Sequence, residues 1–191
     1  MINIIYAVGL NLILGVAGQF SLGHAGFIAI GSYSGAILGK MINGLPGLFA
    51  GMAVGVVISV IVAFLVGLPT LRLKGDYLAI ATLGVAEIIR VAVTNMKITN
   101  GAAGISGIPL TNTWTITYIF LVGTTILILN YTFSSAGRAT YGVLQDEIAA
   151  ESMGVQVTKY KILAFVLGAA TASIGGTLSA TTLGAVTPGD F

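Results

Sequence analysis

Charged residues are so scarce in this chain that they decide which kind of fold is open to it. Only eight Lys and Arg and six Asp and Glu occur among 191 residues, and long windows contain none of them. A soluble domain carries about 25% charged residues, whereas here the share is 7%. The surface cannot be covered with polar groups, so the solvent around most of the chain must be lipid. The sequence therefore predicts a multi-pass membrane protein.

Six hydrophobic segments are candidates for membrane-spanning helices. A helix needs about 20 apolar residues to cross the hydrocarbon core. The candidate segments are Ile2–Ala17, Ala25–Met41, Leu45–Leu68, Tyr77–Met96, Thr113–Phe133 and Lys161–Leu183. The expected fold is all-α, a polytopic transmembrane helix bundle formed by one transmembrane domain over residues 1–191.

The basic residues favour one orientation of this bundle. If the loop Ser134–Tyr160 is cytoplasmic, alternation of the spans leaves two basic residues, Lys40 and Lys97, on the outer side. Five then lie on the cytoplasmic side, namely Arg72, Lys74, Arg138, Lys159 and Lys161. Cytoplasmic loops carry an excess of Lys and Arg, which supports this orientation.

Small residues recur at every fourth position in three of the spans. The series are Gly31, Gly35 and Gly39; Gly47, Gly51 and Gly55; and Gly168, Ala172 and Gly176. Helices in lipid associate through close backbone packing, which such faces permit. The spacing predicts a tightly packed bundle and carries no information about substrate.

Two polar features interrupt the apolar spans. The stretch GQFSLGHAGF (Gly18–Phe27) contains Gln19, Ser21 and His24, the only histidine. It is either a simple connection between two spans or non-helical backbone that lines a path, which lipid tolerates only where protein or water surrounds it. Glu87 and Arg90 lie three residues apart on one helix face, either as a structural ion pair or at the border of a translocation path.

The loop Ser134–Tyr160 contains a segment that we expect to be a short amphipathic helix, Val143–Gly154. Leu144 and Ile148 lie on one side, and the acids Asp146, Glu147 and Glu151 face elsewhere. Gly154 suits the left-handed position that ends many helices. A helix that lies on lipid usually presents Lys and Arg on its polar face, so the three acids favour a protein partner.

Composition also excludes several kinds of site. The chain has no cysteine and one histidine, which leaves no disulfide framework and no multi-histidine metal centre. No basic patch with interleaved aromatic residues suggests nucleic acid. GAILGK (Gly35–Lys40) is one residue short of a phosphate-binding loop and is followed by Met41. We expect no cofactor, no nucleotide site and no catalytic residue in this chain.

The sequence resembles a known family at several places. AAESMG (Ala149–Gly154) looks like the motif of ABC importer permeases in which two alanines, three variable residues and a glycine follow one another. Its surroundings, QDEIAAESMGVQVTKYKILAF, together with GLNLILGVAGQFSLGHAGFIAIGSYSGA and LRLKGDYLAIATLGVAEIIRVAV, resemble the permease subunits of branched-chain amino-acid ABC importers. The wider motif has an acid before the two alanines, whereas this chain has Ile148 there and Glu147 one residue earlier.

The resemblance implies partners and roles. It implies a second related permease, two cytoplasmic ABC ATPase subunits and a periplasmic or lipid-anchored solute-binding protein, in a bacterial or archaeal plasma membrane. The residues implied in coupling to the ATPase are Leu144, Asp146, Glu147, Ala149, Ala150, Glu151 and Gly154. Gln19, Ser21, His24, Glu87 and Arg90 are candidates for the translocation path. Family members are longer, so the chain resembles a fragment that is incomplete at its C-terminus and possibly at its N-terminus.

Two other classes of protein compete with this interpretation. A secondary transporter driven by an ion gradient through Glu87 and His24 would need no ATPase. A polytopic membrane enzyme would show acids, histidines or a nucleophile gathered at one depth, which only Glu87 and Arg90 approach. Within the preferred class, similar permeases serve urea, short amides and other amino acids as well as leucine, isoleucine and valine.

Overall fold

The fold is an all-α helical bundle, as expected. The computed structural model describes residues 1–42, 44–71, 73 and 75–191. Its long helices are α1 (Ile2–Asn11, continued by a π-helical turn η1, Leu12–Val16), α2 (His24–Met41), α3 (Leu45–Thr70), α4 (Asp76–Asn95), α5 (Trp114–Phe133) and α8 (Val157–Leu183). The shorter elements are α6 (Ser135–Gln145), α7 (Glu147–Ser152), the 3-10 turns η2 (Gly101–Ala103) and η3 (Pro188–Asp190), and the strands β1 (Ile105–Ser106) and β2 (Ala185–Val186). Each expected span corresponds to a helix whose ends agree within about one turn.

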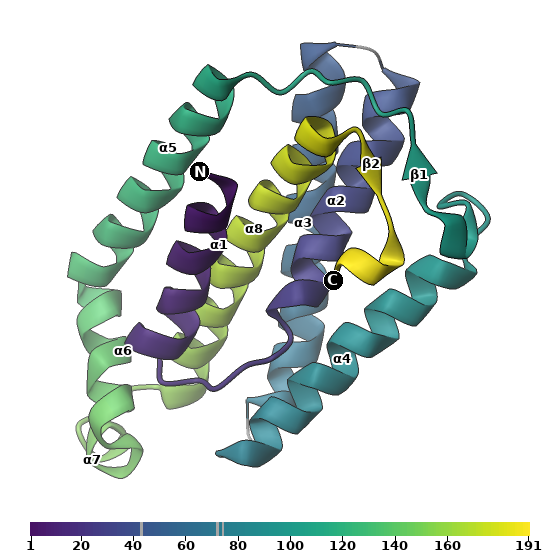
Figure 1. Cartoon of the computed structure of the whole chain (residues 1–191). Coiled ribbons are helices and arrows are strands. Elements are labelled where there is room, and N and C mark those ends of the chain that lie inside the picture. Colours follow the sequence, from purple (N-terminus) through teal and green to yellow (C-terminus); the bar gives the residue numbers. More distant parts are fainter. Residues whose placement is uncertain (43, 72, 74) are drawn as a thin grey trace.

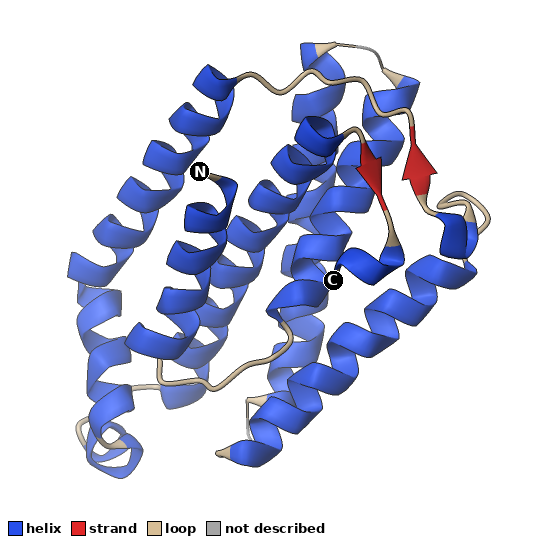
Figure 2. Cartoon of the chain, viewed as in Figure 1, coloured by secondary structure: helices blue, strands red, loops and turns tan. Residues whose placement is uncertain are grey.

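The long helices run alternately up and down, so the connections collect at two ends of the bundle. Figures 1 and 2 show α6 and α7 at one end, together with the connection from η1 to α2 and the start of α4. The end of α2 and the starts of α3 and α5 lie at the other end (Figure 1). Arg138, Lys159 and Lys161 therefore share the α7 end and Lys40 lies at the opposite end, whereas Arg72 and Lys74 lie outside the described residues.

Helices α2, α3 and α8 form the centre of the bundle, and their small residues explain how close they lie. A Cβ atom at Gly31 or Gly35 would overlap Ser173 or Thr177 of α8, and one at Gly51 would overlap Gly35. The predicted small-residue faces are thus confirmed in this region. Gly39 and Gly47 do not contribute, because a Cβ atom at Gly39 would only touch Ile108 at 3.8 Å and Gly47 lies against Ile42 just before α3.

Two reciprocal hydrogen bonds join α2 to α8 where they are closest. The Thr177 hydroxyl donates to the Gly31 carbonyl at 2.9 Å, and the Ser32 hydroxyl donates to the Gly176 carbonyl at 3.0 Å. Between helices in lipid, such bonds add to the packing of small residues. They fix the register of α2 against α8.

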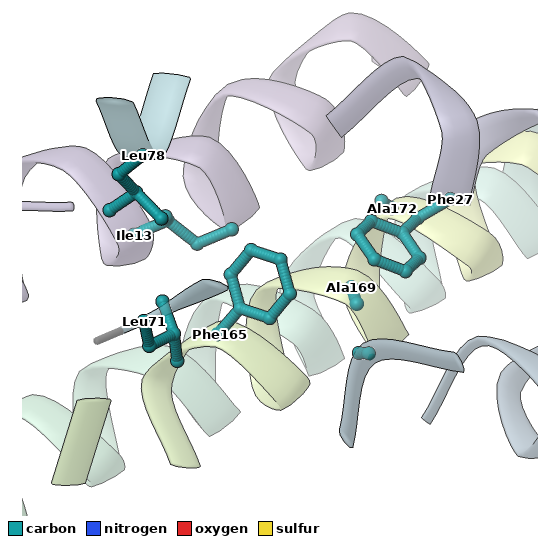
Figure 3. Packing of buried hydrophobic residues seen from close by; sticks show 8 residues of the cluster. Ile13, Phe27, Leu71, Leu78, Phe165, Ala169 and Ala172 are labelled. Atoms are coloured by element: carbon teal, nitrogen blue, oxygen red, sulfur yellow. The ribbon is translucent and has the colours of Figure 1, made fainter. Parts of the chain in front are cut away.

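The largest side chains of the core lie nearer the α7 end. Figure 3 shows Phe27 and Phe165 in contact beside Ala169 and Ala172, with Ile13, Leu71 and Leu78 close by. The two rings meet edge to face, with centroids 5.6 Å apart and planes at 82°. This is a favoured arrangement for aromatic pairs. The cluster connects η1, α2, α3, α4 and α8.

Four of the helices in the described part of the chain are long and apolar enough to cross a membrane, namely α3, α4, α5 and α8. The apolar helix Ile2–Val16 is shorter, and α2 is not among the four, although both were expected to span. Helix α2 contains Ser32, Ser34 and Lys40 and is surrounded by other helices instead of lipid. Large apolar side chains such as Val57, Leu65 and Ile126 are exposed on the outer faces. The chain is therefore a multi-pass membrane protein.

The last eight residues, Gly184–Phe191, fold back against the bundle. Gly184 ends α8 in the left-handed conformation, at φ 72°, and the chain turns back. Strand β2 then pairs antiparallel with β1, with Val186 opposite Ile105. Figure 1 shows η3 beside the first half of α2, about midway along the bundle. This segment forms part of the folded unit.

Candidate functional site

The expected amphipathic helix Val143–Gly154 is not continuous, and this expectation was wrong. Helix α6 ends at Gln145, and α7 begins after Asp146. The Asp146 carboxylate accepts hydrogen bonds from the backbone N–H groups of Ile148 and Ala149, at 2.8 and 3.1 Å. Asp146 thus caps the N-terminus of α7, which favours a new helix over continuation of α6. The Asp146 carboxylate therefore binds the first turn of α7 and is not part of the polar face of an amphipathic helix.

Helix α7 is a short projection at one end of the bundle. Of its residues, Ala150 is buried against the bundle, whereas Ile148, Ala149 and Glu151 are exposed. Met153, just after the helix, is 84% exposed. Gly154 ends the projection at φ 84°, as predicted for a left-handed terminal residue. The exposed surface of this projection is small. Ile148 and Met153 are its large apolar side chains, and Glu151 is its acidic one.

An ion pair connects α7 to the first turns of α8. The ammonium group of Lys161 contacts the carboxylate of Glu147, and the Lys161 side chain is only 10% exposed. A charge in such a place is stable only when it is paired. Glu147, the first residue of α7, is therefore attached to the start of a long helix that runs through the bundle centre.

The connection from η1 to α2 reaches the same place. The Gln19 side-chain amide donates to the Lys161 carbonyl at 2.9 Å. Gly18, at φ 65°, lies so close to Leu144 of α6 that a Cβ atom there would overlap the leucine side chain. Gln19 and Leu144 are thus neighbours of the Glu147–Lys161 pair. A cavity of about 290 Å³ lies among these elements, lined by Gln19, Phe20, Leu78, Glu147 and Lys161.

The second half of that connection is attached to α4. The backbone N–H of Leu22 donates to the Thr82 hydroxyl at 3.0 Å, and Thr82 is almost fully buried. The Ser21 hydroxyl accepts a hydrogen bond from the backbone N–H of Gly23 at 3.3 Å. Ser21 therefore shapes the turn before α2. The Gly18–Gly23 segment, in which Gln19, Ser21 and Gly23 are buried and Phe20 and Leu22 are exposed, forms a strut between α4, α8 and the α6–α7 region.

His24 is the first residue of α2 and lies inside the bundle. It is 8% exposed, faces the backbone of Tyr6, and neither ring nitrogen makes a hydrogen bond of good geometry with the described residues. Gln19 Oε1 is also buried without such a partner. Gln19, Ser21 and His24 are thus gathered at one level, and their role in a translocation path stays a prediction.

Glu87 and Arg90 form the predicted pair, but they face outward. Arg90 Nε lies 3.6 Å from Glu87 Oε1, and about half of each side chain is exposed. The buried residues of α4, which include Leu78, Thr82 and Val93, lie on the other face. The pair does not converge with Gln19, Ser21 and His24 in the described structure. Its place on a path also stays a prediction.

Comparison with known proteins gives the family. The family model described as the permease component of branched-chain amino acid transport systems matches residues 1–191. The chain belongs to this family. As a permease of this family, it is also similar to two proteins named high-affinity branched-chain amino acid transport system permease protein LivM. It is 35% identical to the protein from Salmonella typhimurium and 34% identical to that from Escherichia coli, over the whole chain in both cases.

The permease chain covers 53% of each of these relatives, so it spans about half the length of the curated proteins it matches. No solved structure matches it. Two residues of the described site were not singled out in the sequence. Lys161 and Thr82 lie within the stretches that resemble the family, but no spacing marks them, and their contacts are to residues 14 and 60 positions away in the chain.

Proposed function

We propose that this permease is a membrane-spanning subunit of an ATP-driven importer for branched-chain, hydrophobic amino acids in a bacterial or archaeal plasma membrane. The observation that carries the proposal is the family match over residues 1–191. The relatives named LivM are described as high-affinity branched-chain amino acid permeases, which supports this substrate class for the present chain.

The energy would come from two separate cytoplasmic ATPase subunits. Helix α7 is the proposed contact for them, with Ile148, Glu151 and Met153 as its exposed residues. Asp146 and Gly154 define the two ends of this helix, and Ala150 seats it on the bundle. The remaining partners are a second homologous permease and a solute-binding protein that delivers the amino acid at the outer face.

Movement of α7 would reach the bundle centre through short connections. A shift of Glu147 would move Lys161 and hence α8. The Gly18–Gly23 strut would move with them, because Gln19 is hydrogen-bonded to Lys161 and Gly18 contacts Leu144. Because the strut is bonded to Thr82, α4 and the start of α2 would respond together with α8. Alternating access requires such linked movement of helices around a fixed site.

The test is uptake of radiolabelled leucine by the complete transporter in proteoliposomes. We expect uptake to require ATP and the ATPase subunits, and to continue when an ionophore removes ion gradients. Uptake that stops when the ionophore is added and does not depend on ATP would identify an ion-coupled secondary transporter. Competition by isoleucine and valine, but not by urea, tests the substrate class.

A further inference from the structure

A cavity of about 390 Å³ lies where α1, α2 and α8 meet the folded-back C-terminal segment. It is distinct from the cavity beside Glu147 and contains none of the residues that the sequence suggested for the path. Its walls combine two kinds of side chain. The polar group is Tyr6, Ser32, Ser179 and Asp190, and the apolar group includes Ile28, Leu183, Val186 and Phe191.

The position of this cavity in the membrane is unusual for irregular backbone. Figure 1 shows β2 running from the end of α8 towards the middle of the bundle, where η3 lies about midway between the two ends. Within the hydrocarbon layer, non-helical backbone is tolerated only where protein buries it or where it lines a water-filled space. Binding sites of transporters commonly lie near the midplane beside such interruptions. The Ala185–Phe191 segment meets this description.

Hydrogen bonds hold the segment firmly in this place. The backbone N–H of Ile108 donates to the Gly184 carbonyl at 3.0 Å, and β2 is paired with β1. Asp190 Oδ2 accepts from the backbone N–H of Thr187 at 2.8 Å, within a capping box around η3. These contacts fix the direction of the Asp190 carboxylate at the cavity wall.

We propose that this cavity binds the zwitterionic amino acid during its passage through the permease. The inference rests on the proposed transport function and adds a binding site to it. The Asp190 carboxylate receives the ammonium group. The Tyr6 and Ser179 hydroxyls interact with each other at the cavity wall, which leaves one of the two O–H groups to donate to the carboxylate of the amino acid. The first turn of α2, which borders the cavity at Ala25, adds favourable backbone dipoles on the carboxylate side.

The apolar wall suits a branched aliphatic side chain. Ile28 of α2, Val186 of β2 and Phe191 offer no hydrogen-bonding group to the substrate, so a polar side chain would lose its water without compensation. Tyr33, next to Ser32 in the chain, has a buried hydroxyl without a partner in the described structure, within electrostatic range of Asp190.

A cysteine reporter tests the site without relying on transport alone. Because the chain contains no cysteine, Ala25→Cys would place a single thiol at the cavity wall. In the complete transporter we expect L-leucine to slow maleimide labelling of this thiol at least fivefold. Ala102→Cys, exposed in η2 and outside the cavity, is the matched control and should be labelled at the same rate with and without leucine.

The role of Asp190 is tested by combining the reporter with Asp190→Asn. Loss of a charge-assisted hydrogen bond should raise the leucine concentration needed for protection roughly tenfold or more. The compound 4-methylpentanoate, which is leucine without its amino group, should protect the thiol poorly from labelling in the transporter that retains Asp190. Tyr6→Phe provides a second variant in case Asp190→Asn fails to assemble, and should weaken protection by leucine as well.

The outcomes separate this inference from the proposed function. Equal labelling of Ala25→Cys with and without leucine, in a complex that takes up leucine, would overturn the binding site and leave the transport function standing. A correctly assembled complex that takes up no branched-chain amino acid would remove the proposed function and the site with it. Protection that survives both Asp190→Asn and Tyr6→Phe would show that these groups do not hold the substrate.

Discussion

At the scale of single residues, Lys161 combines two roles in one position. Its ammonium group contacts Glu147 of α7, and its carbonyl accepts the Gln19 amide from the strut before α2. Lys161 of α8 thereby contacts Glu147 in the proposed ATPase contact and Gln19 inside the bundle. Lys161 therefore connects α7 and the strut directly to α8.

Replacement of Lys161 should therefore separate ATP hydrolysis from transport. In Lys161→Met the ion pair is lost while the Gln19 contact to the backbone remains. We expect leucine transported per ATP hydrolysed to fall roughly tenfold, the scale expected when a hydrogen bond to a charged group is lost. The measurement is the ratio of uptake to phosphate release in proteoliposomes.

Lys161→Arg is the matched control, because it keeps the charge and should keep most of the coupling. Equal coupling ratios in Lys161→Met and the parent protein would show that the ion pair only stabilises the fold. A fall of uptake and hydrolysis together would point instead to failed assembly, which co-purification of the ATPase detects.

At the scale of elements, α7 owes its form to its two ends. Asp146 starts it, and Gly154 turns the chain away at a positive φ that side chains other than Asn rarely adopt. Open space surrounds the position that a Cβ of Gly154 would occupy. A bulky residue there would thus meet the partner protein rather than the permease itself.

Gly154→Trp should block docking of the ATPase while membrane insertion stays intact. Gly154→Asn is the control, since Asn tolerates the left-handed conformation and is small. We expect the Trp variant to lose at least nine-tenths of ATP-dependent uptake and of ATPase co-purification, and the Asn variant to keep most of both. Survival of transport in Gly154→Trp would refute the assignment of α7 as the coupling element.

The central helices allow a second test at this scale. A Cβ atom at Gly176 of α8 would overlap the Ile28 carbonyl and the Ser32 backbone nitrogen of α2. Overpacking of this kind costs about 1–3 kcal/mol. We expect Gly176→Val to lower the thermal unfolding midpoint in detergent by several degrees. Gly123→Val on α5, where the Cβ position is open, should leave the midpoint nearly unchanged. Equal midpoints would contradict the close α2–α8 packing.

The helices and loops also show which structural features could be predicted from the sequence. Hydrophobic runs located the helices within about one turn, because each run must match the thickness of the lipid. Spacing of three residues placed Glu87 and Arg90 on one face, since neighbours on a helix surface follow from geometry alone. The break at Asp146 was missed because Asp146 was read as part of a helix face, although Asp is also a favoured N-cap. The Lys161 contacts and the return of Val186 against Ile105 depend on the assembled fold, which no local pattern encodes.

At the scale of the whole molecule, the outward face of α4 carries ionisable groups that the described residues leave uncovered. It carries Glu87 and Arg90 half-exposed within a helix that is otherwise long and apolar enough to span the membrane. Ionisable groups cost about 2.5–3.5 kcal/mol each at the centre of a bilayer, and they usually face protein or water. The described residues supply neither on this face of α4, so protein beyond the described residues is the expected neighbour.

We therefore predict that this face of α4 contacts the second permease subunit. Leu83, which is exposed one turn before Glu87, is the position to test. A cysteine at Leu83 should form cross-links to the second permease with a short thiol-to-amine reagent. A cysteine at Val57, equally exposed on α3, should form none. The charge exchange Glu87→Arg with Arg90→Glu keeps a pair within the helix but reverses its polarity, and should reduce co-purification of the second permease severalfold. If the exchange leaves association unchanged and Leu83→Cys gives no cross-link, the pair serves only to orient α4.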